Sequence, residues 1–239
     1  MQPRLRADRL SKTYGAIAAL SDVSLTVRDG EVLGLIGPNG SGKTTLFECI
    51  AGVLPADTGR VAIDGRAVET GARGWHLFYM PDAIAPWPSE TVGWALDFTI
   101  GFFGGPVARR KDVIDRLDLG PLLNRRIGAL SKGERKRALL AIALLTPQPL
   151  LLADEPFDGL DLRQTREVGA GLREHAASGR TLFLSIHQIT DAARVCDRFV
   201  LLSGGRVCGE GTFEELAALA ATRGAADAGD LEKVVLALT

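Results

Sequence analysis

The sequence predicts an α/β fold with a phosphate-binding loop, and three observations lead to this prediction. Short apolar runs of four or five residues recur along the chain and are typical of strands buried in a sheet. A glycine-rich segment, Gly37–Thr44, directly follows one of these runs and precedes a helical pattern. Between residues 82 and 145 the composition changes and helical periodicity dominates, which predicts an inserted α-helical subdomain.

The composition fits one domain with a packed core. The 239 residues are 46% hydrophobic and 24% charged, and the formal net charge is -1. These values favour a globular protein and give no support for a nucleic-acid-binding surface. The three cysteines lie in apolar settings and indicate buried, reduced thiols of a cytosolic protein. No apolar run approaches the roughly 20 residues that cross a bilayer, and the N-terminus lacks the apolar core of a signal peptide.

The N-terminal part predicts an antiparallel β layer. Residues 5–11 and 19–27 are expected to be strands, with Tyr14 in the turn between them. An exposed aromatic ring at that turn can stack on a nucleotide base, although a ring packed across the turn is the alternative. Residues 59–63 predict a further strand before an Asp-Gly turn, and Leu77–Met80 predicts a buried strand.

The segment Gly37–Thr44 matches the phosphate-loop pattern of Gly, four residues, then Gly-Lys-Ser/Thr. Glycines let the backbone N–H groups approach phosphate oxygens and form a concave anion site. Lys43 reaches the outer phosphates, and the Thr44 hydroxyl is placed to bind Mg²⁺. Val32–Ile36 predicts the strand before the loop. The segment from Thr45 predicts the helix after it, whose N-terminus favours negative charge.

The helical subdomain is marked at its start by prolines and by three tryptophans between positions 75 and 94. Those tryptophans are more often packing contacts than a ligand cage. Ser89 is expected to cap one helix, and Arg109–Leu117 predicts another. Ser131 and Glu134 have the spacing of a capping box, which predicts the start of a helix that continues until Pro147.

Two carboxylates follow the next buried strand. Leu150–Ala153 predicts this strand, and Asp154 and Glu155 lie at its carboxyl end, where ligand chemistry collects in open α/β sheets. Asp161 is expected to cap the following helix, and His187 lies just past the strand that comes next. Taken singly, the Asp-Glu pair also fits a plain turn, and the histidine also fits a structural role.

The chain is expected to form a single domain. Its core comprises residues of about 1–81 and 146–211, with the helical subdomain at about 82–145. The tail, about 212–239, predicts two helical stretches split by glycines at 224 and 229.

The order of these motifs resembles the nucleotide-binding subunit of ABC transporters over nearly the whole chain. Gly37–Thr44 is similar to the Walker A loop and Leu150–Asp154 to Walker B, while Leu130–Glu134 resembles the signature, usually Leu-Ser-Gly-Gly-Gln. Asp158–Asp161 resembles the D-loop and His187 the switch histidine. The resemblance implies a P-loop NTPase (RecA-like) core with an N-terminal antiparallel β layer.

The resemblance also implies a role for each motif residue. Two such chains, as a homodimer or a heterodimer, would face head to tail and bind ATP and Mg²⁺ between them. The implied ATP-binding residues are Tyr14, which would stack on adenine, and Gly37, Pro38, Asn39, Gly40, Ser41, Gly42, Lys43, Thr44 and Thr45. The opposite chain would contribute Ser131, Lys132, Gly133, Glu134 and Asp161. The implied catalytic residues are Glu155, His187 and Lys43, and the implied metal ligands are Thr44, Asp82 and Asp154.

The chain departs from the family pattern at three positions. Lys132 stands where glycine is usual, and Glu134 where glutamine is usual. Asp82 stands where the family normally has a glutamine that joins the core to the helical subdomain. Because a carboxylate is a harder and stronger Mg²⁺ ligand than an amide, Asp82 is expected to make ATP binding more dependent on Mg²⁺. A solvated turn carboxylate is the alternative.

The resemblance implies an ATPase that powers transport through a separate membrane permease from the cytoplasmic face of the cell membrane. The permease would enter a groove near Asp82 and Pro86–Pro88. The C-terminal residues 231–239 resemble the last helix of the exporter-like branch, so export is favoured over import. A soluble ABC ATPase acting on ribosomes or DNA is a second hypothesis, but such proteins usually carry two cassettes or a long coiled-coil insertion. A non-hydrolysing binding module is a third.

Overall fold

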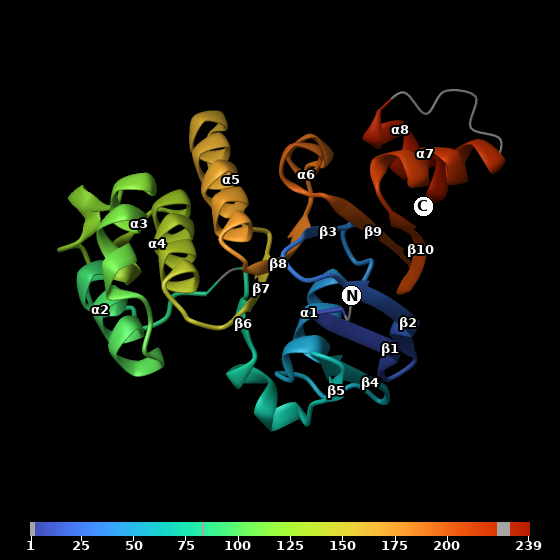
Figure 1. Ribbon diagram of the computed structural model, residues 1–239, viewed down its shortest axis with the longest axis horizontal. Helices are drawn as coiled ribbons and strands as arrows, with labels where there is room; N and C mark the ends of the chain where they lie inside the picture. Colours follow the sequence, from blue (N-terminus) through green and yellow to red (C-terminus); the bar gives the residue numbers. More distant parts are fainter. Residues whose placement is uncertain (1–2, 83, 224–229) are drawn as a thin grey trace.

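The computed structural model describes residues 3–82, 84–223 and 230–239. Two β-sheets form its centre, and helices lie on both sides of the larger one (Figure 1). No helix in the described part of the chain has the length and apolar character needed to span a membrane.

The larger sheet has six strands in the order β10-β9-β3-β8-β7-β6. Neighbouring strands are parallel, except that β10 runs antiparallel to β9. The strands are β3 (Val32–Ile36), β6 (Leu77–Met80), β7 (Leu150–Asp154), β8 (Thr181–Ile186), β9 (Arg198–Ser203) and β10 (Arg206–Gly211). Every residue of β3, β7 and β8 is buried, as expected for central strands covered on both faces.

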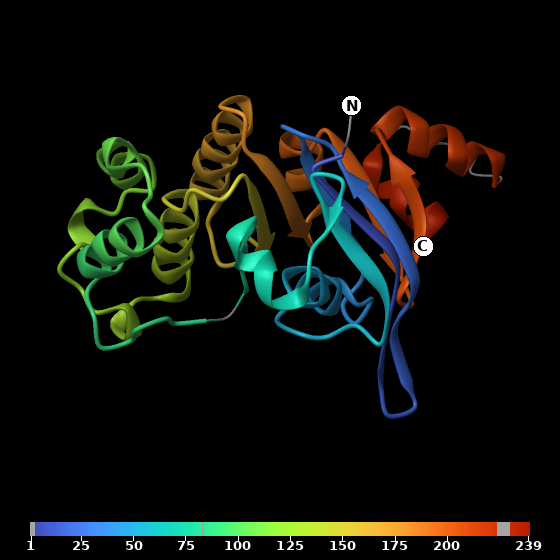
Figure 2. The same ribbon diagram turned by 60° about the horizontal axis from the view of Figure 1, so that its bottom comes forward.

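The smaller sheet is the predicted antiparallel layer, in the order β2-β1-β4-β5. Its strands are β1 (Leu5–Tyr14), β2 (Ile17–Val27), β4 (Thr58–Ile63) and β5 (Arg66–Ala67). Pairing of β1 with β2 continues to Tyr14 opposite Ile17. The turn is therefore only two residues long, with Gly15 at a φ of 60°, which suits a tight hairpin. Tyr14 thus ends a strand and does not lie in the turn, contrary to the prediction. Figure 2 shows this hairpin projecting from the molecule.

Alternate residues of the central strands divide the core in two. Leu33 and Leu35 pack with the antiparallel layer and with α1 (Lys43–Ala51), which lies between the two sheets. Val32 and Ile36 point to the other face and belong to the cluster that includes the helices there. Those helices are α4 (Lys132–Leu144), α5 (Leu162–Ala177) and α6 (Ile189–Val195). This period-two division explains why a strand of five apolar residues is stable between two layers.

The residues between β6 and β7 form the helical region at the left of Figure 1. It contains α2 (Val92–Phe103), α3 (Arg110–Arg116) and α4. Thr91 caps α2, because its side chain accepts a hydrogen bond from the Trp94 N–H at 3.2 Å. The prediction that Ser89 caps a helix was therefore wrong.

The tail folds into α7 (Phe213–Thr222) and α8 (Leu231–Leu238). Contacts join α8 to α6 and α7, and its buried residues Leu231, Val234, Val235 and Leu238 belong to the larger core cluster. The glycines at 224 and 229 that were expected to split the tail lie outside the described residues.

Candidate nucleotide-binding site

The glycine-rich loop between β3 and α1 is tightly enclosed. A Cβ atom at Gly37 would lie 2.1 Å from the Leu202 carbonyl oxygen. At Gly42 the backbone φ is 102°, and a Cβ atom would lie 2.5 Å from the Ala19 carbonyl oxygen. Both positions therefore require glycine. The Ser41 hydroxyl in the same loop is buried and has no hydrogen-bond partner, so the loop contains an unsatisfied polar group next to its backbone N–H groups.

Lys43 points back into this loop. Its ammonium donates a hydrogen bond to the Gly37 carbonyl oxygen at 2.8 Å, and its nitrogen lies 3.9 Å from Glu155 Oε1. The side chain is almost fully buried. A buried cation at the mouth of a loop rich in N–H groups is suited to bind phosphate oxygens.

A chain of hydrogen bonds joins α1 to the ends of β7 and β8. The Thr44 hydroxyl donates to Asp154 Oδ2 at 2.8 Å, and the Ser185 hydroxyl donates to the other oxygen of the same carboxylate. Ser185 Oγ in turn accepts from the Glu155 N–H at 2.9 Å. Ser185 was not predicted from the sequence, because its place beside Asp154 at the end of the neighbouring parallel strand becomes visible only in the structure.

Glu155 is held in an unusual backbone conformation, with a φ of 48°. Its Oε2 accepts a hydrogen bond from the His187 N–H at 3.0 Å. Burial raises the pKa of the Glu155 carboxyl, and the nearby Lys43 ammonium opposes that rise. A half-buried carboxylate with a raised pKa, next to a phosphate-binding lysine, is well placed to accept a proton or orient water.

Glu155, His187 and Asn39 of the phosphate loop line one cavity of about 300 Å³. Its lining residues are Asn39, Asp82, Glu155, Phe157, Asp158, Ile186, His187, Gln188 and Asp191. The structure therefore brings the phosphate loop, the carboxylate after β7 and the histidine after β8 to one place, because all three follow neighbouring parallel strands.

Asp82 also lines this cavity, but its carboxylate has a partner that the sequence analysis did not identify. Asp82 Oδ1 accepts a hydrogen bond from the Lys136 ammonium at 2.6 Å. Lys136 lies on α4 and is only 3% exposed. The acidic residue at this position thus pairs with a buried cation of the helical region.

The capping box at the start of α4 is confirmed. Ser131 Oγ accepts from the Glu134 N–H at 3.3 Å, and Glu134 Oε2 accepts from the Ser131 N–H at 2.8 Å. Glu134 Oε1 also accepts from Arg125 at 2.5 Å. Lys132 pairs with Asp158 at 2.6 Å. Within this chain, Glu134 and Lys132 are therefore engaged by intramolecular partners.

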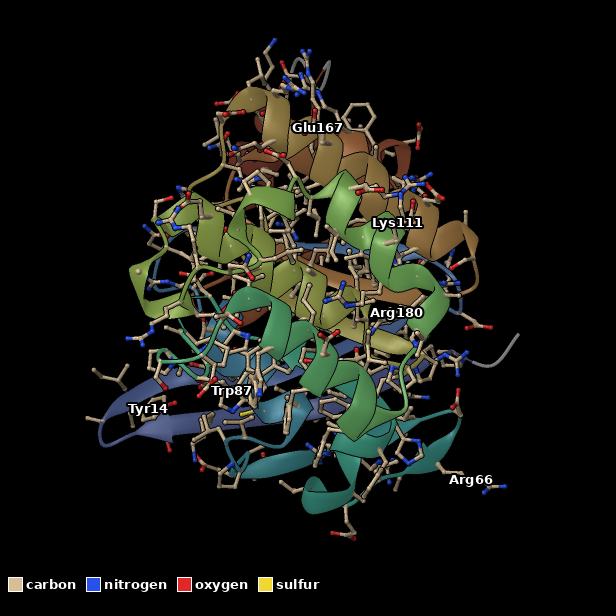
Figure 3. The ribbon with its side chains drawn as sticks, turned by 90° about the vertical axis from the view of Figure 1, so that its left-hand side faces the viewer. Tyr14, Arg66, Trp87, Lys111, Glu167 and Arg180 are labelled. Carbon is tan, nitrogen blue, oxygen red and sulfur yellow. The ribbon has the colours of Figure 1, made fainter. Side chains whose placement is uncertain are left out.

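The other predicted site residues lie on separate elements. Tyr14 is 48% exposed near the end of the hairpin, where Figure 3 labels it. The Lys12 ammonium lies 6.0 Å from the centre of its ring. Asp161 caps α5, because its carboxylate accepts from the Gln164 N–H at 2.8 Å.

The fit of a divalent cation rests on Thr44 and Asp154. Within residues 3–82, 84–223 and 230–239, no group of three or more His, Cys, Asp or Glu side chains could hold a metal by itself. Mg²⁺ in phosphate-binding sites commonly uses only one or two carboxylates, with substrate phosphates and water as the other ligands. A hydroxyl and a carboxylate in direct contact beside the phosphate loop therefore suit Mg²⁺.

A parallel sheet whose strand ends gather a phosphate loop, an Asp-Glu pair and a histidine defines a P-loop nucleotide-binding protein. The family model described as ABC transporter matches residues 20–158, which is more than half of the chain. The chain therefore belongs to the ABC transporter ATP-binding family, whose cassettes bind and hydrolyse ATP.

The relatives include importers and exporters. The chain is 35% identical over 213 residues to the sn-glycerol-3-phosphate import ATP-binding protein UgpC 1 of Rhizobium johnstonii, with 87% of this chain and 58% of the relative covered. It is 30% identical to the lipopolysaccharide export system ATP-binding protein LptB of Haemophilus influenzae, with 89% and 92% covered. The chain therefore spans less than two thirds of the length of UgpC 1. A solved ATP-binding subunit of an ABC transporter superposes with a TM-score of 0.87 at 29% identity, covering 98% of both chains.

Proposed function

We propose that this chain hydrolyses ATP at the cavity beside the phosphate loop and thereby powers transport by a membrane permease. The observation that carries the proposal is the position of Glu155. Its carboxylate is half-buried between the Lys43 ammonium and the His187 N–H, on the wall of a cavity that the phosphate loop reaches through Asn39. This is the arrangement that phosphoryl transfer to water requires, a positioned base beside groups that neutralise phosphate charge.

In this proposal the chain's own residues divide the work. The N–H groups of Gly37–Thr44 and the Lys43 ammonium bind the phosphates. Glu155 orients the attacking water and accepts its proton, and His187 contacts the γ-phosphate. Thr44 and Asp154 would hold Mg²⁺, and Asp82, which lines the cavity, is a proposed third ligand. When bound, Mg²⁺ neutralises phosphate charge.

A second chain is proposed to complete the site. Tyr14 stacks on the base of the nucleotide, and the opposite chain contributes Ser131, Gly133 and Asp161. Ser131 lies at the N-terminus of α4, where unpaired N–H groups and the helix dipole favour an anion. Because Lys132 and Glu134 are engaged within their own chain, we assign the contact with the opposite nucleotide mainly to Ser131 and Gly133.

The permease is proposed to dock beside the exposed aromatic face of α2. Trp94, Phe98 and Phe102 are partly exposed and stack along this helix, and Trp87 packs edge-on against the first two (Figure 3 labels Trp87). Exposed aromatic clusters are characteristic of protein–protein interfaces. The face lies next to Pro86–Pro88, where the sequence placed the permease groove.

Export is the direction we propose, on the strength of α8. This helix packs its apolar side against α6 and α7, and its sequence resembles the exporter-like branch. One relative carries an import name and another an export name, so the direction depends on the transport experiment.

Three measurements test the proposed function. Purified chain with Mg-ATP should release phosphate, and absence of release at all protein concentrations and with the permease present would contradict the ATPase assignment. In detergent extracts the chain should copurify with an integral membrane protein. Copurification with ribosomes or DNA would favour a soluble ABC ATPase. Reconstitution of that complex into vesicles, with substrate movement followed on each side, tests export.

A further inference from the structure

Lys136 is a buried cation whose one ion-pair partner among the described residues is Asp82. Lys136 lies one turn after the start of α4, and its ammonium contacts Asp82, which is two residues past the end of β6, at 2.6 Å. An ammonium that is removed from water is strongly destabilising unless it is paired. The pair therefore ties the second turn of α4 to the edge strand of the six-stranded sheet. A neutral glutamine at position 82, as the family usually has, could not neutralise Lys136.

A second ion pair lies on the same face of α4. Lys132 is four residues before Lys136, which places the two side chains on one side of the helix. Its ammonium contacts Asp158 in the loop between β7 and α5 at 2.6 Å. Its stem lies over Gly159, because a Cβ atom at Gly159 would be 2.9 Å from Lys132 Cγ. A Cβ atom at Gly133 would in turn be 2.6 Å from the Gly159 carbonyl oxygen.

We infer that the pairs Lys136–Asp82 and Lys132–Asp158 form an ion-pair bridge that positions the N-terminus of α4 on the nucleotide-binding core. The bridge makes Lys136 and Asp158 positioning residues for the reaction. Two of the three departures from the family pattern, Asp82 and Lys132, are members of it. Both of its carboxylates line the same cavity as Glu155 and His187, so it runs along the wall of the candidate active site.

The two ion pairs differ in how exposed they are to solvent. Lys136 is 3% exposed and depends on Asp82, whereas the side chains of Lys132 and Asp158 are 66% and 40% exposed. Because solvent and salt screen the Lys132–Asp158 pair, it contributes little to stability. The first pair therefore fixes the position of α4, and the second limits rotation of its first turn. The inference rests on the proposed function, because Ser131 at the N-cap of α4 is the group whose position matters.

The first experiment uses the full chain with Lys136→Met, which removes the charge and keeps most of the side-chain volume. We expect kcat for phosphate release to fall about tenfold, a coupling of the size seen between neighbouring residues. The Kd of the single chain for ATP should stay within about twofold, because the phosphate loop is untouched. Hydrogen exchange at the Glu134 N–H, which reports the α4 cap, should become faster. Unchanged kcat and exchange would overturn the inference.

The matched control is Lys111→Met. Lys111 pairs with Asp115 at 2.7 Å on the exposed surface of α3, so the same change should leave kcat and the Glu134 exchange rate near wild type. A wild-type chain that released no phosphate would count against the proposed function. In that case the exchange measurement would still decide whether the bridge positions α4.

The second experiment compares Asp82→Gln with the double change Asp82→Gln and Lys136→Met. Asp82→Gln alone leaves the buried ammonium without a carboxylate, so its kcat and melting temperature should fall. The double variant removes both charges and should recover part of both losses. If Asp82 were only a Mg²⁺ ligand, the effects of the two substitutions would add independently. That result would contradict the ion-pair bridge.

Lys132→Gln tests the exposed pair in a variant that should fold normally, since it keeps the stem over Gly159. We expect a reduction of kcat of about threefold at low ionic strength that disappears near 0.5 M salt, where wild-type charges are also screened. If Lys132→Gln and wild type had equal kcat at low ionic strength, Lys132 would not be part of the ion-pair bridge.

Discussion

At the scale of single residues, Lys43 is a cation held ready for an anion. It is buried, and its ammonium donates to the backbone carbonyl oxygens of Gly37 at 2.8 Å and Pro38 at 3.4 Å and lies 3.9 Å from a carboxylate oxygen of Glu155. Lys43→Ala should weaken ATP binding by about 2 kcal/mol, or roughly 30-fold in Kd, because a charge-assisted contact is lost. A titration with ATP measures this, and circular dichroism should show that the fold survives. Unchanged affinity would contradict the phosphate-loop assignment.

Glu155 is the residue whose ionisation should control the rate. Burial raises the pKa of its carboxyl, and only the ionised form can accept a proton from water. Turnover should therefore fall on acidification at a higher pH than for an ordinary glutamate, while ATP binding persists. Glu155→Gln keeps the shape and removes the base, so kcat should fall about 10²–10⁴-fold at every pH. Steady-state phosphate release across pH measures both effects. If turnover of Glu155→Gln still fell on acidification at the same pH, the titrating group would be a residue other than Glu155.

At the scale of elements, α4 is held at both ends. Its N-terminus has the capping box. At its C-terminus, Arg180, which directly precedes β8, donates to the carbonyl oxygens of Ala143 at 2.9 Å and Leu144 at 3.4 Å. Arg180 is 7% exposed, and Figure 3 labels it among the helices. Arg180→Met should lower the free energy of unfolding by about 2–4 kcal/mol, because the buried hydrogen bonds of the guanidinium to Ala143, Leu144 and Thr146 are lost.

Chemical denaturation measures this loss. The matched control is Arg163→Met, which breaks an exposed pair with Glu167 on α5 and should change stability by less than about 1 kcal/mol. Equal stability of Arg180→Met and wild type would show that water can replace the guanidinium at the end of α4.

Elements were predictable wherever one local rule decided them. The apolar run Leu77–Met80 became β6 with its predicted bounds, and the spacing of Ser131 and Glu134 gave the cap of α4. The cap of α2 was not predictable, because both Ser89 and Thr91 offer a hydroxyl before the helix and only tertiary structure selects Thr91. Strand β10 and helix α6 were missed, since their polar, glycine-containing or short segments have no strong periodicity.

The residues of the candidate site also fall into two groups, those that a local motif predicts and those that tertiary structure brings in. Residues in contiguous motifs, such as Lys43, Asp154 and Glu155, were found from sequence because their spacing is fixed by one turn of chain. Ser185 and Lys136 were not found, because each acquires its role from a partner that is more than 30 residues away. Such pairings depend on strand order and helix docking, which a single sequence does not specify.

At the scale of the whole molecule, the two groups of residues that the proposed reaction needs lie on different parts of one chain. The phosphate loop and Glu155 follow strands of the central sheet, whereas Ser131 begins a helix of the helical region (Figure 1). Ser131 Oγ accepts a hydrogen bond from its own helix, and no contact of the described residues joins it to Lys43. This separation is the physical reason to expect two chains in a working enzyme.

Ser131→Arg tests that expectation. A bulky cation at the start of α4 should block the approach of a second chain's nucleotide and abolish turnover. ATP binding to the single chain should stay near wild type, because the phosphate loop is unchanged. Mixing this variant with Lys43→Ala should restore activity to at most one site per dimer, since one pairing unites an intact phosphate loop with an intact Ser131. Phosphate release over a range of mixing ratios measures this. If Ser131→Arg weakened ATP binding to the single chain as much as Lys43→Ala does, Ser131 would serve its own chain's nucleotide, and the two-chain site would be wrong.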